Sequence, residues 1–215
     1  MKLKQETVKA KALFLAPHTD DAELGCGGTI AKFVEEGREV HVASFSIAEE
    51  SVRPGFPKDA LMKEFRKAMN VLGVPEPCLY TFRFRVRNFP EYRQDILDEI
   101  VNLRNSIKPD IVFVPSPNDI HQDHQVIASE GLRVFKKISI LGYELPWNNI
   151  SFETRSFVKL EQRHLKKKIE ALKCYETQKH RAYLNEEFIT SLARTRGTQF
   201  ENEYAEAFEV LRYIL

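Results

Sequence analysis

The segment ALFLA at residues 12–16 leads directly into PHTDDAELGCGG at residues 17–28. Five consecutive apolar residues predict a short strand that is buried on both faces. From Leu24 to Glu36 apolar residues return at helical spacing, and Gly37 is a natural helix stop. A buried strand that passes through a polar turn into a helix is the first unit of a parallel α/β sheet.

The same alternation continues along the chain. Further buried strands are predicted at Val40–Ser46, Cys78–Phe82 and Ile111–Pro115, with helices at Lys58–Leu72 and Glu91–Ile107. Strands and helices that alternate at this length imply parallel strands joined by right-handed crossovers. The predicted fold class is therefore α/β, a Rossmann-like three-layer α/β/α sandwich with a mainly parallel sheet.

The last third of the chain is more basic and less regular. It contains two possible strands at Ile138–Leu145 and Glu153–Lys159, a helix at Glu161–Tyr175 and a final strand at Tyr204–Tyr213. Lys166, Lys167 and Lys168 are expected on the solvated face of that helix. Because there is no repeat, low-complexity tract or Pro/Gly/Ser linker, we expect one domain over residues 1–215.

Composition excludes several classes of protein. The 215 residues include 32 Lys and Arg against 31 Asp and Glu, a net charge of +1, which argues against a nucleic-acid-binding protein built on a basic face. The apolar runs are too short for a membrane span, and the first 17 residues lack a signal-peptide pattern. Three widely spaced cysteines form no disulfide framework, so a cytoplasmic location is expected, and a homo-oligomer stays open.

Chemistry-bearing residues follow the first strand. His18 and Asp21 are three positions apart, so a tight turn can direct an imidazole nitrogen and a carboxylate oxygen at one metal ion. The alternative is that Asp20 and Asp21 cap the next helix. A dinucleotide-binding loop is excluded, because the glycines do not give G-x-G-x-x-G and acidic residues would repel phosphate. The glycines instead predict close packing of the helix on the sheet.

A second polar cluster, His121-Gln-Asp-His124, follows the strand that ends at Pro115. A polar loop with a helix cap from Asp123 is the alternative interpretation. Both clusters follow strands of one parallel sheet, and ligands bind such sheets at the carboxyl ends of the strands. Three nitrogen or oxygen ligands with one open position are typical of a catalytic zinc site. The two clusters together therefore predict a mononuclear metal centre.

The stretch APHTDDAELGCGGT resembles the first motif of the zinc-dependent N-acetylglucosaminyl deacetylases of the LmbE/PIG-L family, and His121-Gln-Asp-His124 resembles the second. The resemblance implies that His18, Asp21 and His124 hold the zinc ion. Ala22 stands where many members have glutamate, and Glu23 follows one position later. The role of that glutamate is therefore open in this chain.

The resemblance also implies catalytic roles for three residues. Asp20 is the expected general base, His121 is expected to face the developing oxyanion in its protonated form, and Asp123 is expected to orient a neighbouring histidine. The implied cofactor is one Zn²⁺ per chain, with Fe²⁺ or another divalent ion as an alternative. The implied reaction is removal of the N-acetyl group from a small N-acetylated amino sugar derivative.

Substrate contacts are predicted from position along the chain. Arg83, Arg85 and Arg87 follow the third strand and are expected to bind a phosphate or carboxylate of an acidic GlcNAc conjugate. The alternative is a solvent-facing edge strand with alternating charges. Tyr143 and Trp147 are expected to line the sugar site, although such aromatic residues are also common in protein cores.

Two other functions remain open from the sequence. One is a metal-dependent hydrolase that acts on another bond, such as the amide of a thiol conjugate or a phosphoester. The other is a non-catalytic Rossmann-like domain that binds a sugar nucleotide, which would hold no metal.

Overall fold

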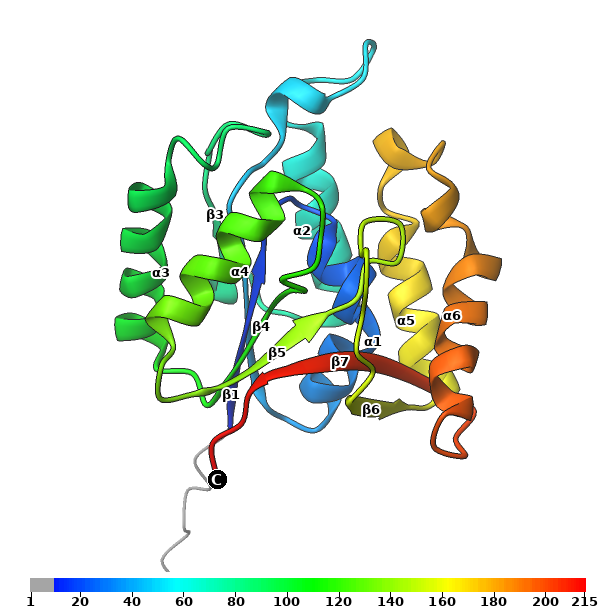
Figure 1. Ribbon diagram of the computed structural model, residues 1–215. Helices are drawn as coiled ribbons and strands as arrows, with labels where there is room; N and C mark the ends of the chain where they lie inside the picture. The colour runs from blue at the N-terminus through cyan, green and yellow to red at the C-terminus, as the bar shows by residue number, and fades with distance from the viewer. Residues whose placement is uncertain (1–9) are drawn as a thin grey trace, which may run out of the picture.

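A computed structural model describes residues 10–215. The strands are β1 (Lys11–Ala16), β2 (Glu39–Ser44), β3 (Leu79–Thr81), β4 (Ile111–Pro115), β5 (Ser139–Tyr143), β6 (Ser156–Leu160) and β7 (Tyr204–Arg212). They form one sheet in the order β3-β2-β1-β4-β5-β7-β6 (Figure 1). The first five strands in this order are parallel, whereas β7 pairs antiparallel with both β5 and β6. The predicted α/β fold with a mainly parallel sheet is confirmed.

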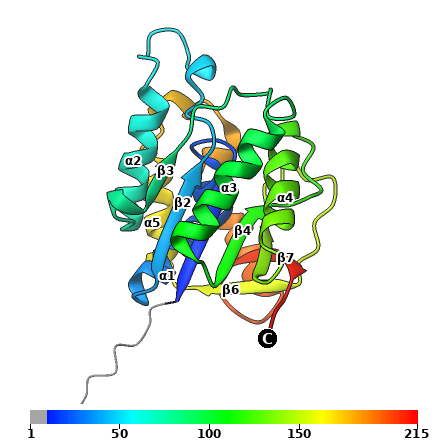
Figure 2. The same ribbon diagram turned by 90° about the vertical axis from the view of Figure 1, so that its left-hand side faces the viewer.

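Helices cover both faces of the sheet. They are α1 (Asp21–Glu35), α2 (Ala60–Leu72), α3 (Arg93–Ile107), α4 (Gln122–Val134), α5 (Gln162–Leu172) and α6 (Glu186–Thr198). One buried cluster joins the sheet to α1, α2, α5 and α6, and a second joins it to α3 and α4 (Figures 1 and 2). None of the helices in residues 10–215 has both the length and the apolar character that crossing a bilayer requires.

The structure corrects several predictions. The segment Cys78–Phe82 is not buried on both faces, because β3 lies at an edge of the sheet and its residues are only partly buried. The helices α4 and α6 were not predicted, since each begins in a polar segment that conceals its periodicity. The prediction that the first 17 residues are not a signal peptide rests in part on residues 1–9, which lie outside the described residues.

Two of the three glycines of α1, Gly25 and Gly28, allow the helix to approach the sheet closely, as predicted, whereas Gly27 faces Lys168 of α5. A Cβ atom added at Gly25 would lie 2.5 Å from Cδ2 of Tyr143. One added at Gly28 would lie 2.4 Å from Cδ1 of Leu160. Both distances are far below van der Waals contact, so the absence of side chains here sets the position of α1 and of the loop before it.

A buried ion pair fastens α5 to β7. Lys168 was expected on a solvated face, but it is only 4% exposed, because α5 packs against α1 along the side that carries it. Its ammonium lies 2.6 Å from Oε1 of Glu206. The Glu206 carboxylate also accepts from the backbone N–H groups of Gly28 and Thr29 at 2.9 and 2.7 Å. One carboxylate therefore links α1, α5 and β7.

We expect Glu206→Ala to lower the free energy of unfolding by about 3–5 kcal/mol, because it leaves the Lys168 ammonium buried without a counter-ion. Urea denaturation measures the change. Lys166→Ala is the matched control, since this lysine is exposed and its pair with Glu170 should contribute less than about 1 kcal/mol. A loss below 1 kcal/mol in Glu206→Ala would contradict the structural role of the pair.

Candidate functional site

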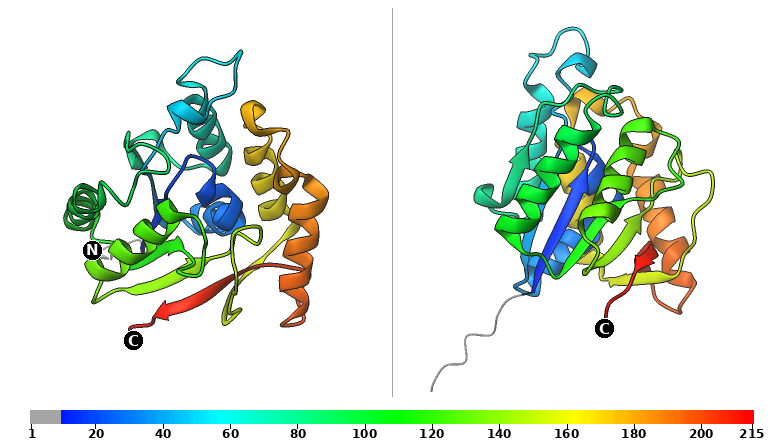
Figure 3. Two further views of the ribbon diagram at one scale, coloured as in Figure 1. Left: turned by 45° about the horizontal axis from the view of Figure 1, so that its top comes forward. Right: turned by 60° about the vertical axis from the view of Figure 1, so that its left-hand side comes forward.

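The candidate site lies where the strand order reverses direction. After β1 the chain crosses to α1 on one face of the sheet, and after β4 it crosses to α4 on the other. Such a divergence opens a crevice at the carboxyl ends of the two strands. The loops that surround this end of the sheet are seen in Figure 3, left, where the top of the molecule comes forward. His18 and His124 both lie at this crevice, as the two sequence motifs predicted.

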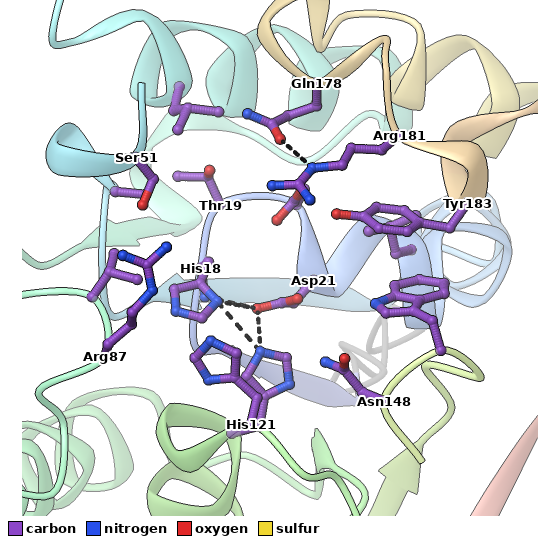
Figure 4. A pocket seen from close by; sticks show the side chains of 17 residues that line it. His18, Thr19, Asp21, Ser51, Arg87, His121, Asn148, Gln178, Arg181 and Tyr183 are labelled. Carbon is purple, nitrogen blue, oxygen red and sulfur yellow. Dashed lines mark hydrogen bonds and ion pairs between the residues drawn. The ribbon is translucent and has the colours of Figure 1, made fainter. Parts of the chain in front are cut away.

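Three ligand atoms form a tight triangle (Figure 4). Nδ1 of His18 lies 3.1 Å from Oδ2 of Asp21, and Nε2 of His124 lies 3.4 Å from the same oxygen. The two histidine nitrogens are 3.3 Å apart. Ligands placed tetrahedrally at about 2.1 Å from a zinc ion stand about 3.4 Å from one another. The donor set and its spacing therefore fit a tetrahedral metal ion with one open position.

His121 lies beside this triangle and is held less closely. Ring nitrogens of His18, His121 and His124 fall within 4.8 Å of one another, which is a looser set than the triangle that contains Asp21. Nδ1 of His121 accepts a hydrogen bond from the backbone N–H of Asp123 at 3.2 Å. The proton of a neutral ring is therefore on Nε2, which leaves an N–H donor on a residue that lines the cavity.

Two buried carboxylates orient the histidines of the triangle. Oδ2 of Asp123 lies 3.0 Å from Nε2 of His18, and Oδ2 of Asp119 lies 2.7 Å from Nδ1 of His124. A carboxylate on the far nitrogen fixes the tautomer of a metal-binding histidine and raises its basicity. Asp123 was predicted to orient a histidine. Asp119 was missed, because nothing in its spacing distinguishes it from an ordinary loop aspartate.

Opposite charges stabilise each other within the triangle. Burial lowers the pKa of His18, but hydrogen bonds to Asp123 and Asp21 outweigh it and raise the pKa to about 10. Burial raises the pKa of Asp21, but the charges of His124 and His18 outweigh it and lower the pKa to about 2. Without a metal, the site is therefore held together by protons on nitrogen, and a metal cation would take their place.

The pKa of Asp20 is raised whereas that of Asp21 is lowered, and the pKa of His121 is lowered whereas that of His18 is raised. Burial and the charge of Asp21 raise the pKa of Asp20 to about 6. Burial and the charges of His18 and His124 lower the pKa of His121 to about 4, so this ring is neutral at pH 7, whereas a protonated ring was expected. Asp20 precedes α1 but makes no capping hydrogen bond, which removes the helix-cap explanation for it.

A cavity of about 250 Å³ opens over the triangle. Its walls come from the loops after β1, β2, β3, β4 and β5 and from the connection between α5 and α6. Among the predicted residues, the cavity brings together His18, Asp20, Asp21, Arg87, His121, His124 and Trp147. These residues come from four separate segments that follow β1, β3, β4 and β5, so only the folded chain assembles them.

Three predicted substrate contacts are not at this cavity. Tyr143 is fully buried under α1, and its hydroxyl donates to the backbone oxygen of Leu15, so it belongs to the core. Arg83 and Arg85 pair with Glu49 and Glu50 at a separate hollow. The alternative of a solvent-facing segment with alternating charges describes these two arginines better.

One wall of the cavity was missed altogether. Gln178, Arg181 and Tyr183 lie in the connection between α5 and α6 and line the cavity opposite Arg87 (Figure 4). The ring of Tyr183 stacks on Trp147 with centroids 4.1 Å apart and planes 12° apart. These residues follow no periodic pattern, so only the folded chain reveals that they reach the site.

Buried hydrogen bonds hold that connection in place. The Glu64 carboxylate of α2 accepts from the backbone N–H of Thr177 at 3.0 Å and from its hydroxyl at 2.6 Å. The hydroxyl of Tyr175 donates to Oε1 of Glu23 at 2.5 Å and also contacts the backbone oxygen of Thr19. Glu23, whose role the sequence left open, therefore ties this connection to the loop that carries His18.

We expect Thr177→Val to loosen the connection, because valine keeps the shape of threonine but leaves Glu64 without its hydroxyl partner. Losing a hydrogen bond to a charged group costs about 1.5–3 kcal/mol. If the free energy of local opening falls by this amount, the amide hydrogens of residues 176–184 should exchange roughly ten to a hundred times faster. Thr198→Val is the matched control, since that hydroxyl donates to a helix carbonyl on the surface. Unchanged exchange in Thr177→Val would show that the bond does not hold the segment.

Comparison with known proteins identifies the family. Residues 13–135, more than half of the chain, match the family model "PIG-L: GlcNAc-PI de-N-acetylase". The chain belongs to the PIG-L family, as the sequence motifs predicted. It is 26% identical over 172 residues to the uncharacterized deacetylase YaiS of Escherichia coli strain K12, an alignment that covers 75% of this chain and 88% of that relative.

Solved structures share the fold. N,N'-diacetylchitobiose deacetylase from Pyrococcus horikoshii superposes with a TM-score of 0.78 at 22% identity, covering 94% of this chain and 83% of that one. GalB, the 4-carboxy-2-hydroxymuconate hydratase from Pseudomonas putida KT2440, superposes with a TM-score of 0.76 at 21% identity, covering 96% and 98%. A deacetylase and a hydratase thus share this architecture, and the fold alone does not decide the reaction.

Proposed function

We propose that this protein is a metal-dependent N-deacetylase that removes the acetyl group from a small GlcNAc-containing molecule. The observation that carries the proposal is the triangle of His18 Nδ1, Asp21 Oδ2 and His124 Nε2, with edges of 3.1–3.4 Å, beside the carboxylate of Asp20. The family match and the deacetylase relatives support the reaction class.

His18, Asp21 and His124 would hold the ion, with Zn²⁺ favoured by two imidazoles and one carboxylate and Fe²⁺ as the alternative. A divalent cation at this point supplies Lewis acidity, which polarises an attacking water molecule and an amide carbonyl. Asp119 and Asp123 keep the two imidazoles oriented toward the ion. The protein's part is to hold this geometry fixed while the substrate enters.

Asp20 is the proposed general base. Its carboxylate lines the cavity next to Asp21, and burial and the charge of Asp21 raise its pKa above that of an ordinary aspartate, which makes it a better proton acceptor. It accepts the proton of the attacking water and can return that proton to the departing amine. The amide then divides into acetate and a free amino sugar.

His121 is the proposed donor to the developing oxyanion. The backbone N–H of Asp123 occupies its Nδ1, so the ring offers the Nε2 hydrogen and needs no positive charge to donate it. A fixed donor of this kind contributes about a hundredfold or more to the rate. The stacked rings of Trp147 and Tyr183 give the cavity a flat apolar wall suited to a sugar ring.

Asp20→Asn should lower kcat for release of amine from N-acetylglucosamine derivatives by about a hundred- to ten-thousandfold while the metal stays bound, because the amide side chain cannot accept the water proton. Asp59→Asn is the matched control, since Asp59 also precedes a helix without capping it and does not line the cavity. Metal content and amine release are measured on the same samples. A domain that only binds its ligand, or a hydratase, would release no amine in either form.

Asp119→Asn should weaken metal binding by about ten- to a hundredfold, because the amide no longer draws the Nδ1 proton of His124 toward a negative charge. Competition with a chromophoric chelator measures the affinity. The control is Asp110→Asn, an exposed carboxylate that accepts from the backbone of Lys11 at 2.7 Å. Equal affinities in the two variants would show that the Asp119–His124 contact has no bearing on the metal.

A further inference from the structure

Arg87 has a backbone conformation that favours glycine. Its φ is 70°, in the left-handed region where a Cβ is disfavoured. The conformation directs the N–H groups of Arg87 and Phe89 to the Asp123 carboxylate at 2.6 and 3.2 Å. Glycine would supply the same N–H with less strain, yet an arginine is present and its side chain lines the cavity. Strain retained at a cavity points to a function of the side chain.

Arg181 faces the same cavity from another wall. Figure 4 shows both guanidinium groups extending toward the middle of the cavity, with His18 and Asp21 below them. Gln178 accepts from Nε of Arg181 at 3.5 Å, and the Gln178 amide donates to the hydroxyl of Thr177 at 3.2 Å. The hydrogen bonds from Thr177 to Glu64 connect this series of contacts to α2. The side-chain contact of Arg181 is thus with a buried amide and not with a carboxylate.

The two cavity arginines differ from the arginines beside them. Arg83 and Arg85 are neutralised by Glu49 and Glu50 at 2.8 and 2.9 Å. Within residues 10–215, neither Arg87 nor Arg181 forms an ion pair with an acidic side chain. The acidic residues that line the cavity are Asp20 and Asp21, at its metal-binding end. Two positive charges are therefore left to face the open part of the cavity.

We propose that Arg87 and Arg181 form an anion subsite that selects substrates with a carboxylate or phosphate group beyond the acetylated sugar. This inference rests on the proposed deacetylase function and adds the substrate class. Guanidinium groups bind such oxyanions with charge-assisted hydrogen bonds from two directions. A cavity of about 250 Å³ is small for a ligand site, so the charged group would lie toward its rim, while the acetamide lies at the triangle.

The test compares three substrates with the metal-loaded enzyme. They are the neutral methyl glycoside of N-acetylglucosamine, N-acetylglucosamine 1-phosphate, and N-acetylmuramic acid, which carries a carboxylate. Amine release gives kcat/KM for each. We expect at least one anionic substrate to exceed the neutral one about tenfold or more, and the preferred compound distinguishes phosphate from carboxylate.

Arg87→Gly and Arg181→Gln should each reduce that preference by about ten- to a hundredfold, mainly through KM. Glycine at position 87 keeps the N–H to Asp123 and suits the backbone, so this variant is expected to fold, which thermal unfolding and metal content verify. Arg87→Lys should retain part of the preference. Arg85→Gln is the matched control, because its guanidinium is already paired outside the cavity.

The outcomes separate the two proposals. If amine is released with no preference for charge, or if the preference survives in both arginine variants, the subsite is wrong and the deacetylase function stands. If no compound releases amine, the deacetylase function fails, and calorimetric titration of the same three compounds decides the subsite. Tighter binding of an anionic compound that is lost in Arg87→Gly supports it, and equal binding of all three overturns it.

Discussion

One carboxylate oxygen of Asp21 connects the two halves of the site. It accepts from the backbone N–H of His18 at 2.8 Å, lies 3.1 Å from the ring of that histidine, and lies 3.4 Å from the ring of His124. The first two contacts fix the turn after β1, and the third reaches α4 on the other face of the sheet. The acidic residue at the start of α1 therefore determines how closely two separate crossovers approach.

The features that the sequence could predict are the ones that short segments specify. A run of buried apolar residues defines a strand almost by itself, and the polar motif after it is positioned by that strand. The rule that ligands bind at the carboxyl ends of parallel strands then brings the motifs of His18 and His124 together without any knowledge of side-chain contacts. The parallel part of the sheet and the proposed metal ligands are therefore accessible from the sequence.

The features that could not be predicted depend on packing between distant segments. Asp119 and Arg181 reach the site through turns and short 3₁₀ segments that have no hydrophobic period. The sequence predicts that Lys168 is a surface residue, because only the folded structure shows that Glu206 of β7 lies beside it. In the arginine-rich segment, alternation predicts one face for all three side chains, but the left-handed turn at Arg87 sends that side chain to the cavity, away from the other two.

The two sides of the site are supported by different parts of the fold. The half with the proposed metal ligands rests on the central strands of the sheet, where buried carboxylates hold His18 and His124 and leave little room for substitution. The opposite wall rests on the connection between α5 and α6, which is tied to the rest of the protein through Glu64 and Glu23. A net charge of +1 conceals this arrangement, because carboxylates gather around the proposed cation, while the guanidinium groups of Arg87 and Arg181, which form no ion pair within residues 10–215, line the other end of the cavity.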